Sequence, residues 1–564
     1  MSLSLKKYQE IFVDSGLLKE EEFVQALKES ESSGQQIESV LVNFGFVSDN
    51  QIGHLMADAY GVKFVNLRRQ KIDPKYINVV PEAMRKRQGA IVYGQIKDKV
   101  QVAMVDPQNF ELIGFIQKKV QRPLEIGYMT PELASSVAMD QDEDITTKIN
   151  TYVTQFEEMR KSGEIAPGAQ VGNEDFIIEL VDLLTKYGHH QGASDVHIEP
   201  KEKTSTVRYR IDGILHDLFT FPQALHEFVV ARIKILSNLR TDEHYSAQDS
   251  KFRLRVGGEP VNIRVSIVPI AHGEKVVMRI LSEHGGRLTM ESLGLNPEDL
   301  AKLESAASKP YGMILSTGPT GSGKTTSLYA ILKKLNTREV NIQTIEDPVE
   351  YGVEGVNQIQ VNEKTGLTFA NGLRAIVRQD PDIILVGEIR DTETASISIN
   401  SAMTGHLVLS TLHTNDAATA IPRLIDMEIE RFLIASTVNL IIAQRLVRKI
   451  CPECVSSNQI NLVQYKDSIP PAIYKKFFGA KKKERLYFGK GCQSCNFLGF
   501  SGRLGIFEIM EITTRIREMI MKQANAEEIM TEAVKEGMTT MLEDGLRKVK
   551  SGQTNIEEVL RVVK

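Results

Sequence analysis

The sequence lacks tryptophan, has only four cysteines and shows no excess of positive charge. Its 68 lysines and arginines are outnumbered by 73 acidic residues, and the resulting net charge of −5 argues against a protein whose main task is to bind nucleic acid. Four cysteines in 564 residues exclude a fold held by disulfides, and a chain of this length can bury several cores without them. The length suggests about four domains.

Long apolar runs are also missing. Residues Met1–Tyr8 contain no apolar signal core. The longest uncharged stretch, Thr394–Asn415, is rich in Ser, Asn, Thr and His and is too polar to span a bilayer, and Phe432–Gln444 is too short. We therefore expect a cytoplasmic protein without direct membrane insertion, which reaches a membrane only through a partner.

The cysteines form two Cys-x-x-Cys pairs. In a reducing compartment such pairs indicate a metal site, because four thiolates in a tetrahedron suit structural Zn²⁺. A closed four-cysteine site leaves no open coordination position, so we expect a structural role. The predicted zinc ligands are Cys451, Cys454, Cys492 and Cys495.

Residues 318–325 fit the phosphate-binding pattern G-x-x-x-x-G-K-[ST]. A short apolar strand at Met313–Ser316 precedes the pattern, and apolar residues at helical spacing follow it. The glycines let backbone N–H groups surround a β-phosphate, Lys324 reaches the β- and γ-phosphates, and the Thr325 hydroxyl binds Mg²⁺. The predicted nucleotide-binding residues are Gly318, Thr320, Gly321, Ser322, Gly323, Lys324, Thr325 and Thr326.

Two carboxylates follow buried strands, where ligands of α/β sheets bind. Glu388 follows Ile383–Val386, and Glu346 ends the strand that begins at Asn341. One should activate the attacking water and the other should hold the Mg²⁺ shell, and the sequence leaves open which does which. Gly387 stands where the second acidic motif of P-loop enzymes usually has Asp, so this strand lacks the usual side chain for direct binding of Mg²⁺. We therefore expect it to contact Mg²⁺ through water.

Two histidines, His406 and His413, flank another buried strand. A histidine near the γ-phosphate can sense whether that group is present. We interpret both as functional candidates, although a single histidine at such a position is more often structural.

The pattern of strands and helices divides the rest of the chain. Alternating segments between residues 206 and 280 predict strands with an arginine-rich outer face. From about Gly312, strands and helices alternate, which predicts an α/β core with a mainly parallel sheet. The last ~120 residues are expected to be mostly helical. We predict domains at 1–140, 173–285, 286–430 and 431–564, with a linker at 141–172.

Taken together, these motifs resemble the secretion ATPase superfamily of type II secretion and type IV pili, the GspE/PilB family. The resemblance covers roughly residues 173–564 and includes several motifs in fixed order. The matching stretches are 193–200, 208–213, 318–326, 344–350, 372–382, 387–391 and 405–415.

The resemblance implies a RecA-like P-loop core with a preceding PAS-like α/β domain and a helical, zinc-containing C-terminal region. It implies a homohexameric ring motor that hydrolyses ATP in the cytoplasm and acts on an inner-membrane platform protein. It also implies that Arg264 and Arg279, in the PAS-like domain, contact the nucleotide. An arginine that reaches the γ-phosphate would tie hydrolysis to domain closure.

The zinc site and the N-terminal extension resemble the pilus assembly ATPases of the family and their secretion counterparts, since its pilus-retraction ATPases lack both. Chain length and an N-terminal domain that resembles the MshEN type favour the pilus, and we therefore predict a motor for type IV pilus assembly. A type II secretion ATPase is the alternative, and the sequence separates the two only weakly. A DNA-translocating ring ATPase is a more distant alternative, which the net charge and the absence of Trp oppose.

The first ~140 residues resemble an MshEN-type domain, which in some members binds cyclic di-GMP through an Arg-Leu-Gly motif in each repeat. The matching positions here are Lys7-Tyr8-Gln9 and Gln36-Ile37-Glu38. The arginine that would bind a guanine or phosphate is replaced, and the glycine that allows close backbone approach is lost. Cyclic di-GMP therefore stays a hypothesis that these replacements oppose.

Overall fold

The computed structural model describes residues 8–14, 18, 20–33, 37–44, 47, 49–67, 72–77, 79–131, 133–134, 145–162, 175–256, 259–281, 289–492, 495 and 497–563. The chain forms two compact units. The first comprises Met1–Glu164 and Cys492–Asn496, and the second comprises Ile165–Gly491 and Phe497–Lys564.

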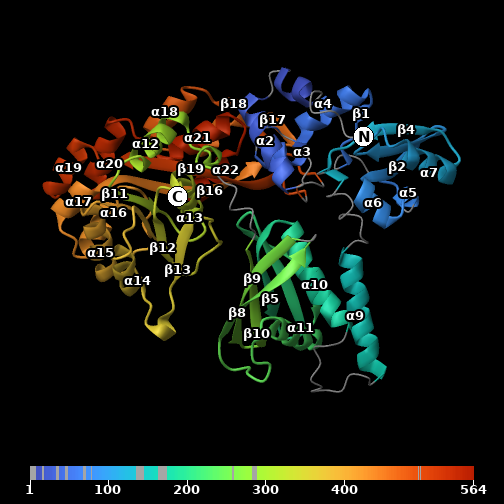
Figure 1. Ribbon diagram of the computed structural model, residues 1–564, viewed down its shortest axis with the longest axis horizontal. Coiled ribbons are helices and arrows are strands. Elements are labelled where there is room, and N and C mark those ends of the chain that lie inside the picture. The colour runs from blue at the N-terminus through green and yellow to red at the C-terminus, as the bar shows by residue number, and fades with distance from the viewer. Residues whose placement is uncertain are drawn as a thin grey trace. The chain divides into compact units, whose positions relative to one another are not determined.

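The first unit combines helices with a small sheet (Figure 1). Its sheet has the strand order β1-β4-β3-β2, with β2 antiparallel to β3 and the other pairs parallel. The elements are η1 (Glu10–Asp14), α2 (Glu20–Ser33), α3 (Ile37–Asn43), α4 (Asp49–Tyr60), β1 (Lys63–Phe64), α5 (Pro74–Ile77), α6 (Glu82–Gln88), β2 (Ala90–Ile96), β3 (Lys99–Met104), α7 (Phe110–Val120) and β4 (Leu124–Tyr128).

The segment predicted as a linker contains a helix, α9 (Ile145–Ser162). Residues 141–144 and 163–172 lie outside the described part of the chain. The helix has few apolar residues, but it buries Ile149 and Phe156 almost completely. Such a sparse apolar face gives a weak periodic signal, which explains why the sequence predicted no helix here.

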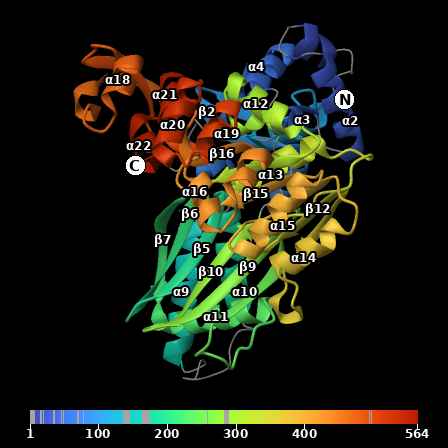
Figure 2. The ribbon, with the colours of Figure 1, turned by 90° about the vertical axis from the view of Figure 1, so that its left-hand side faces the viewer.

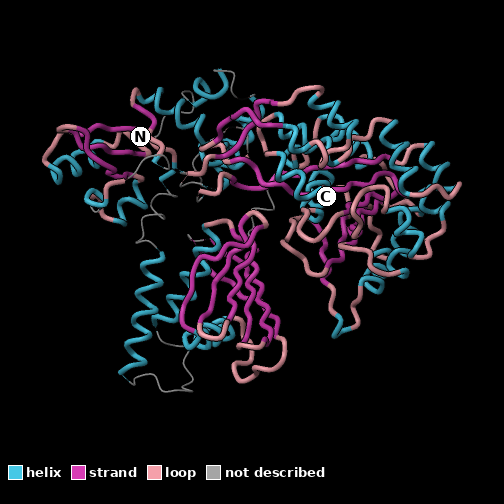
Figure 3. Tube along the Cα trace, turned by 180° about the vertical axis from the view of Figure 1, so that it is seen from behind, coloured by secondary structure: helices cyan, strands magenta, loops and turns pink. Residues whose placement is uncertain are grey.

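A six-stranded antiparallel sheet begins the second unit, with the order β7-β6-β5-β10-β9-β8. Figure 3 shows the strands of this unit in magenta. Helices α10 and α11 pack against one face (Figure 2), and the strands alternate buried and exposed residues as a sheet with one covered face requires. The elements are α10 (Asp175–His190), β5 (Ala193–Pro200), β6 (Thr204–Ile211), β7 (Ile214–Pro222), α11 (Gln223–Leu236), β8 (Gln248–Val256), β9 (Glu259–Ile270) and β10 (Gly273–Leu281).

The second sheet has seven strands in the order β13-β12-β14-β15-β11-β16-β19, and all neighbours are parallel except β16 and β19. Apolar cores form on both faces, one with α12 and α13 and the other with α14, α15 and α17. The elements up to this point are α12 (Pro297–Ala307), β11 (Gly312–Thr317), α13 (Lys324–Leu335), β12 (Ile342–Glu346), β13 (Val356–Gln360), α14 (Phe369–Val377), β14 (Ile383–Val386), α15 (Thr392–Met403), β15 (Leu407–Leu412), α16 (Ala420–Asp426) and α17 (Arg431–Thr437).

The C-terminal region contributes strands that the sequence did not predict. The strand β16 (Val438–Ile450) lies beside β11, where both of its faces are buried, so it shows none of the alternation that marks a half-exposed strand. The strand β19 (Phe500–Glu511) pairs with it. The remaining elements are β17 (Val455–Asn461), α18 (Pro471–Phe478), β18 (Lys483–Gly489), α19 (Thr514–Met521), α20 (Ala526–Lys535), α21 (Met541–Lys550) and α22 (Ile556–Val563).

Short turns of 3-10 helix complete the second unit, at Glu291–Leu293, Glu363–Thr365 and Leu462–Tyr465. Among the helices that the structure describes, none has both the length and the apolar character needed to cross a membrane.

Hydrogen bonds accepted by Glu558 link α22 to β16. Its carboxylate accepts hydrogen bonds from the Arg448 guanidinium (2.7 Å), the Arg448 amide (3.2 Å) and the Arg561 guanidinium (2.7 Å). Burial alone would raise the pKa of Glu558, but these donors outweigh it and lower the pKa to about 2.

Because this pKa lies below the ordinary 4.5, the contacts of Glu558 stabilise the folded chain fully above pH 4.5 and lose their effect as the pH falls toward 2. We expect Glu558→Gln to lower the unfolding temperature near neutral pH, and this deficit to shrink as the sample is acidified. Calorimetry over a pH series checks it, with the exposed Glu518→Gln as control. A deficit that stays constant with pH would contradict the assignment.

Candidate functional site

The phosphate-binding pattern forms the turn between β11 and α13, as predicted. Gly318, Gly321 and Gly323 have φ of +146°, +77° and +90°, a region that favours glycine. Lys324, at the start of α13, donates from Nζ to the carbonyls of Gly318 (2.8 Å) and Pro319 (3.1 Å). Burial lowers the pKa of Lys324, and the nearby Glu388 carboxylate opposes this shift. The structure therefore brings the eight predicted nucleotide-binding residues into one loop and helix start.

The two predicted carboxylates lie at the same edge of the sheet but differ in surroundings. Glu346 is only 2% exposed, and it accepts hydrogen bonds from Thr344 Oγ1 (2.6 Å), Gln358 Nε2 (3.3 Å) and the Tyr329 hydroxyl. Sequence reasoning missed Tyr329 and Gln358, because α13 and β13 bring them to Glu346 only in the folded chain.

Glu388, in contrast, is held by two side chains that are themselves exposed. It pairs with Arg390, and its Oε2 lies 3.3 Å from His413 Nε2. His413 is 51% exposed and Arg390 61%, so this carboxylate is close to solvent. The carboxylate also lies close enough to Lys324 to oppose the lowering of its pKa.

The structure separates the two predicted histidines. His413 follows the carboxyl end of β15, next to Glu388. His406 precedes the amino end of the strand, where its Nδ1 lies 2.9 Å from Ser401 O and its carbonyl accepts from Gly312 N. Seven residue steps at about 3.3 Å each put His406 roughly 23 Å from His413. Within one chain, His406 is therefore not brought to the phosphate-binding loop.

Arg264 and Arg279 are cross-strand partners on β9 and β10 and therefore share a face of the six-stranded sheet. Arg279 Nε donates to Asp195 Oδ1 (3.0 Å), and Asp195 is 5% exposed. Burial raises the pKa of Glu350, in the acidic segment after β12, and both arginines oppose that shift. The sequence analysis gave Asp195 no role, since the register that pairs it with Arg279 belongs to the sheet.

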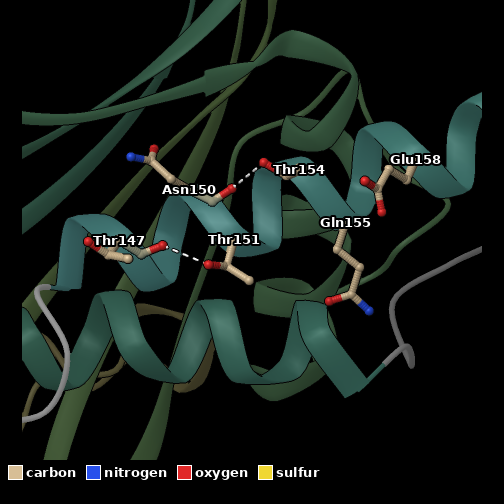
Figure 4. Close-up of a pocket in the computed structure, with 6 residues that line it drawn as sticks. All are labelled: Thr147, Asn150, Thr151, Thr154, Gln155 and Glu158. Atoms are coloured by element: carbon tan, nitrogen blue, oxygen red, sulfur yellow. Dashed lines mark hydrogen bonds between the residues drawn. The ribbon is translucent and has the colours of Figure 1, made fainter.

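A pocket of about 390 Å³ lies along α9 and is lined by polar residues of that helix (Figure 4). Two of its hydroxyls donate to carbonyls of the same helix: Thr151 Oγ1 to Thr147 O and Thr154 Oγ1 to Asn150 O, each at 2.9 Å. Intrahelical bonding of this kind is ordinary for helical threonine and gives the pocket no chemistry.

The four cysteines converge, as predicted. Their Sγ atoms lie within 4.8 Å of one another, and Cys492 Sγ and Cys495 Sγ are 3.7 Å apart. Metal–sulfur bonds of about 2.3 Å in a tetrahedron require sulfur–sulfur distances of about 3.8 Å, so the spacing fits a four-thiolate metal site. The backbone at Gly489 and the backbone at Gly499, which flank the second cysteine pair, pack closely together. A Cβ on Gly489 would lie only 1.9 Å from Gly499 O.

The sequence pattern of the family described as "Type II/IV secretion system protein" matches residues 170–561. The chain belongs to this family. The MshEN domain pattern matches residues 60–144. The resemblance inferred from the motifs is confirmed, and the protein is an ATPase of the pilus assembly and secretion class.

Relatives from both machines match this secretion ATPase almost from end to end. It is 36% identical to the type IV pilus assembly ATPase PilB of Myxococcus xanthus, over 98% of each chain. It is 37% identical to type II secretion system protein E of Xanthomonas campestris pv. campestris, over 98% of this chain and 97% of the relative. The solved ATPase DotB of Legionella pneumophila shares the fold, with a TM-score of 0.50 at 19% identity over 71% of this chain and 97% of that one.

We expect Glu388→Gln to keep ATP binding within about twofold and to lower turnover by roughly 10²–10⁴-fold, because the amide cannot accept a proton from water. Nucleotide titration and steady-state ATPase assays check both values. Lys324→Ala is the matched variant that should lose binding. Undiminished turnover in Glu388→Gln would transfer the general-base role to Glu346.

We expect the purified chain to contain about one zinc ion, and chelation to loosen β17 and β18 because a structural metal contributes folding free energy. Elemental analysis and hydrogen exchange check these results. In Cys454→Ser, which should lack the metal, the chelator should cause no further change. Unaltered exchange after metal removal from the wild-type chain would contradict a structural zinc.

Proposed function

We propose that this chain is a cytoplasmic motor that assembles as a homohexamer and drives type IV pilus assembly through an inner-membrane platform protein. The arginines support this most. Arg264 and Arg279 belong to the six-stranded sheet, whereas the phosphate-binding loop and Glu388 belong to the seven-stranded sheet. A site whose parts are carried by two sheets can couple hydrolysis to movement between them.

We assign the roles in the core from the contacts described above. The backbone N–H groups from Gly318 onward and the start of α13 bind the phosphates, and Lys324 neutralises their charge. Thr325 would hold Mg²⁺, which neutralises phosphate charge when bound. Glu388 orients and deprotonates the attacking water, and His413, next to its carboxylate, senses the γ-phosphate.

Glu388 is preferred to Glu346 as the general base because water can reach it. Glu346 is 2% exposed and already accepts three hydrogen bonds, whereas the side chains that contact Glu388 are themselves exposed. We therefore assign Glu346 to the Mg²⁺ shell through water. Arg264 and Arg279 stabilise the charge that develops on the transferred phosphoryl group.

The second candidate is the type II secretion ATPase. The relative from Xanthomonas campestris matches this chain over the same length as the pilus relative and at nearly the same identity. Chain length, which favoured the pilus in the sequence, is therefore shared by both machines. The ATP-hydrolysing mechanism proposed above is the same for both candidates. They differ only in whether the motor assembles a pilus or drives secretion.

In the N-terminal unit, we propose that cyclic di-GMP is not bound through the altered motif positions. Tyr8 donates its hydroxyl to Glu38 Oε1 (2.7 Å), so an internal hydrogen bond joins the two repeats where the motifs would stand. Lys7 and Gln36 lie outside the described residues. A carboxylate at such a position would also repel a phosphodiester.

Deletion of the gene in its host tests the cargo, with surface pili and secreted enzymes measured in the same strains. We expect pili to be lost, secretion to persist, and wild-type chain to restore pili where Glu388→Gln does not. Expressed beside the wild-type chain, Glu388→Gln should suppress piliation, because inactive subunits enter shared rings. Loss of secretion with intact pili would establish the alternative cargo, and the absence of suppression would oppose a ring.

A further inference from the structure

Gln444 lies on β16 at the level where β11 turns into the phosphate-binding loop. Its neighbour Ala443 is the register partner of Thr317, the last residue of β11. The Gln444 side chain is 1% exposed. It is therefore a buried carboxamide beside the loop, and a buried amide is stable only when its donor and acceptor are both satisfied.

Both ends of this carboxamide bind the nucleotide-binding segment. Gln444 Nε2 donates to Ser322 O (2.7 Å), in the loop, and Gln444 Oε1 accepts from Ser327 Oγ (2.8 Å), in the first turn of α13. One side chain thus links the loop to the helix that carries Lys324 and Thr325. No sequence pattern marked Gln444, Ser327 or the strand β16.

Gln444 also packs closely against the loop. A Cβ on Gly318 would lie 2.7 Å from the backbone carbonyl of Gln444, and one on Gly323 would lie 2.9 Å from the side-chain Nε2. Contact with the β16 backbone therefore requires glycine at position 318, in addition to its positive φ.

The bond to Ser322 O has a consequence for the loop amides. In a trans peptide, the C=O and the following N–H point in opposite directions. When Gln444 holds the Ser322 carbonyl toward β16, the Gly323 N–H points away from β16, on the side where the loop amides bind a phosphate. Without this bond, the peptide could rotate and turn a carbonyl toward the phosphate.

We propose that Gln444 is a positioning residue that fixes the orientation of the loop peptides, so that nucleotide affinity depends on a side chain acting only through Ser322 and Ser327. The role differs from ordinary packing in one measurable way. A packing residue changes unfolding temperature and affinity together, whereas Gln444 changes affinity beyond its effect on stability.

Asn439 offers a matched control on the same strand. It is 9% exposed and also uses both ends of its amide, donating from Nδ2 to Tyr311 O (3.0 Å) and accepting from Lys309 Nζ (3.3 Å). These contacts lie at the opposite end of β11, away from the loop. Asn439→Leu and Gln444→Met each replace a buried amide by an apolar side chain of similar size.

The experiment measures the affinity of the full chain for ADP and ATP by calorimetry, and its unfolding temperature without nucleotide. We expect Gln444→Met to weaken ATP affinity about tenfold or more, and Asn439→Leu to change it by less than about twofold at a similar loss of unfolding temperature. Gln444→Glu keeps the acceptor for Ser327 but loses the donor to Ser322, and it should also weaken ATP binding.

A double-mutant cycle with Ser327→Ala separates the two bonds and serves if Gln444→Met folds poorly. The affinity losses of Ser327→Ala and Gln444→Glu should be smaller together than the sum of the single losses, because both act on the same segment. Equal affinity in Gln444→Met and Asn439→Leu, or wild-type affinity in both Gln444→Glu and Ser327→Ala, would overturn the proposal.

Discussion

Four parallel strands, β11, β12, β14 and β15, end at one edge of the seven-stranded sheet. Each candidate site residue at this edge either ends one of these strands or follows it. The phosphate-binding loop follows β11, Glu346 ends β12, Glu388 follows β14 and His413 follows β15. Parallel pairing forces the carboxyl ends together, so a loop amide, two carboxylates and an imidazole converge without any loop having to fold across the sheet. His406 illustrates the same constraint, since it precedes β15 and is held at the other edge.

The second constraint is electrostatic: arginines of the six-stranded sheet act on a carboxyl group of the core. Arg279 is bound by Asp195 within the six-stranded sheet, and with Arg264 it opposes the raised pKa of the half-buried Glu350 in the core. In the proposed motor, Arg279 would exchange its carboxylate partner Asp195 for a phosphate when the sheets move. This gives the proposed motor a physical link between the nucleotide and domain position.

Much of the core was predictable, because its signals are local. The glycines of the loop, the apolar strand before it and the helical periodicity after it lie within a few residues of one another. The cysteine pairs carry their spacing in the same way. The strand β16 was missed, because a strand buried on both faces lacks the alternation that marks a half-exposed strand. The sparse apolar face of α9 was missed for lack of signal.

The sequence by itself determined the chemistry: a phosphate-binding loop, acids that follow strands, four thiolates and a chain without a long apolar run. Only the tertiary structure decided which of these groups meet. It surrounded Glu346 with Tyr329, Thr344 and Gln358, left Glu388 next to solvent, and set the Gln444 amide between Ser322 and Ser327. Except for the short step from Thr344 to Glu346, these contacts join residues well apart in the chain, and strand register with helix packing fixes them, which no local pattern encodes.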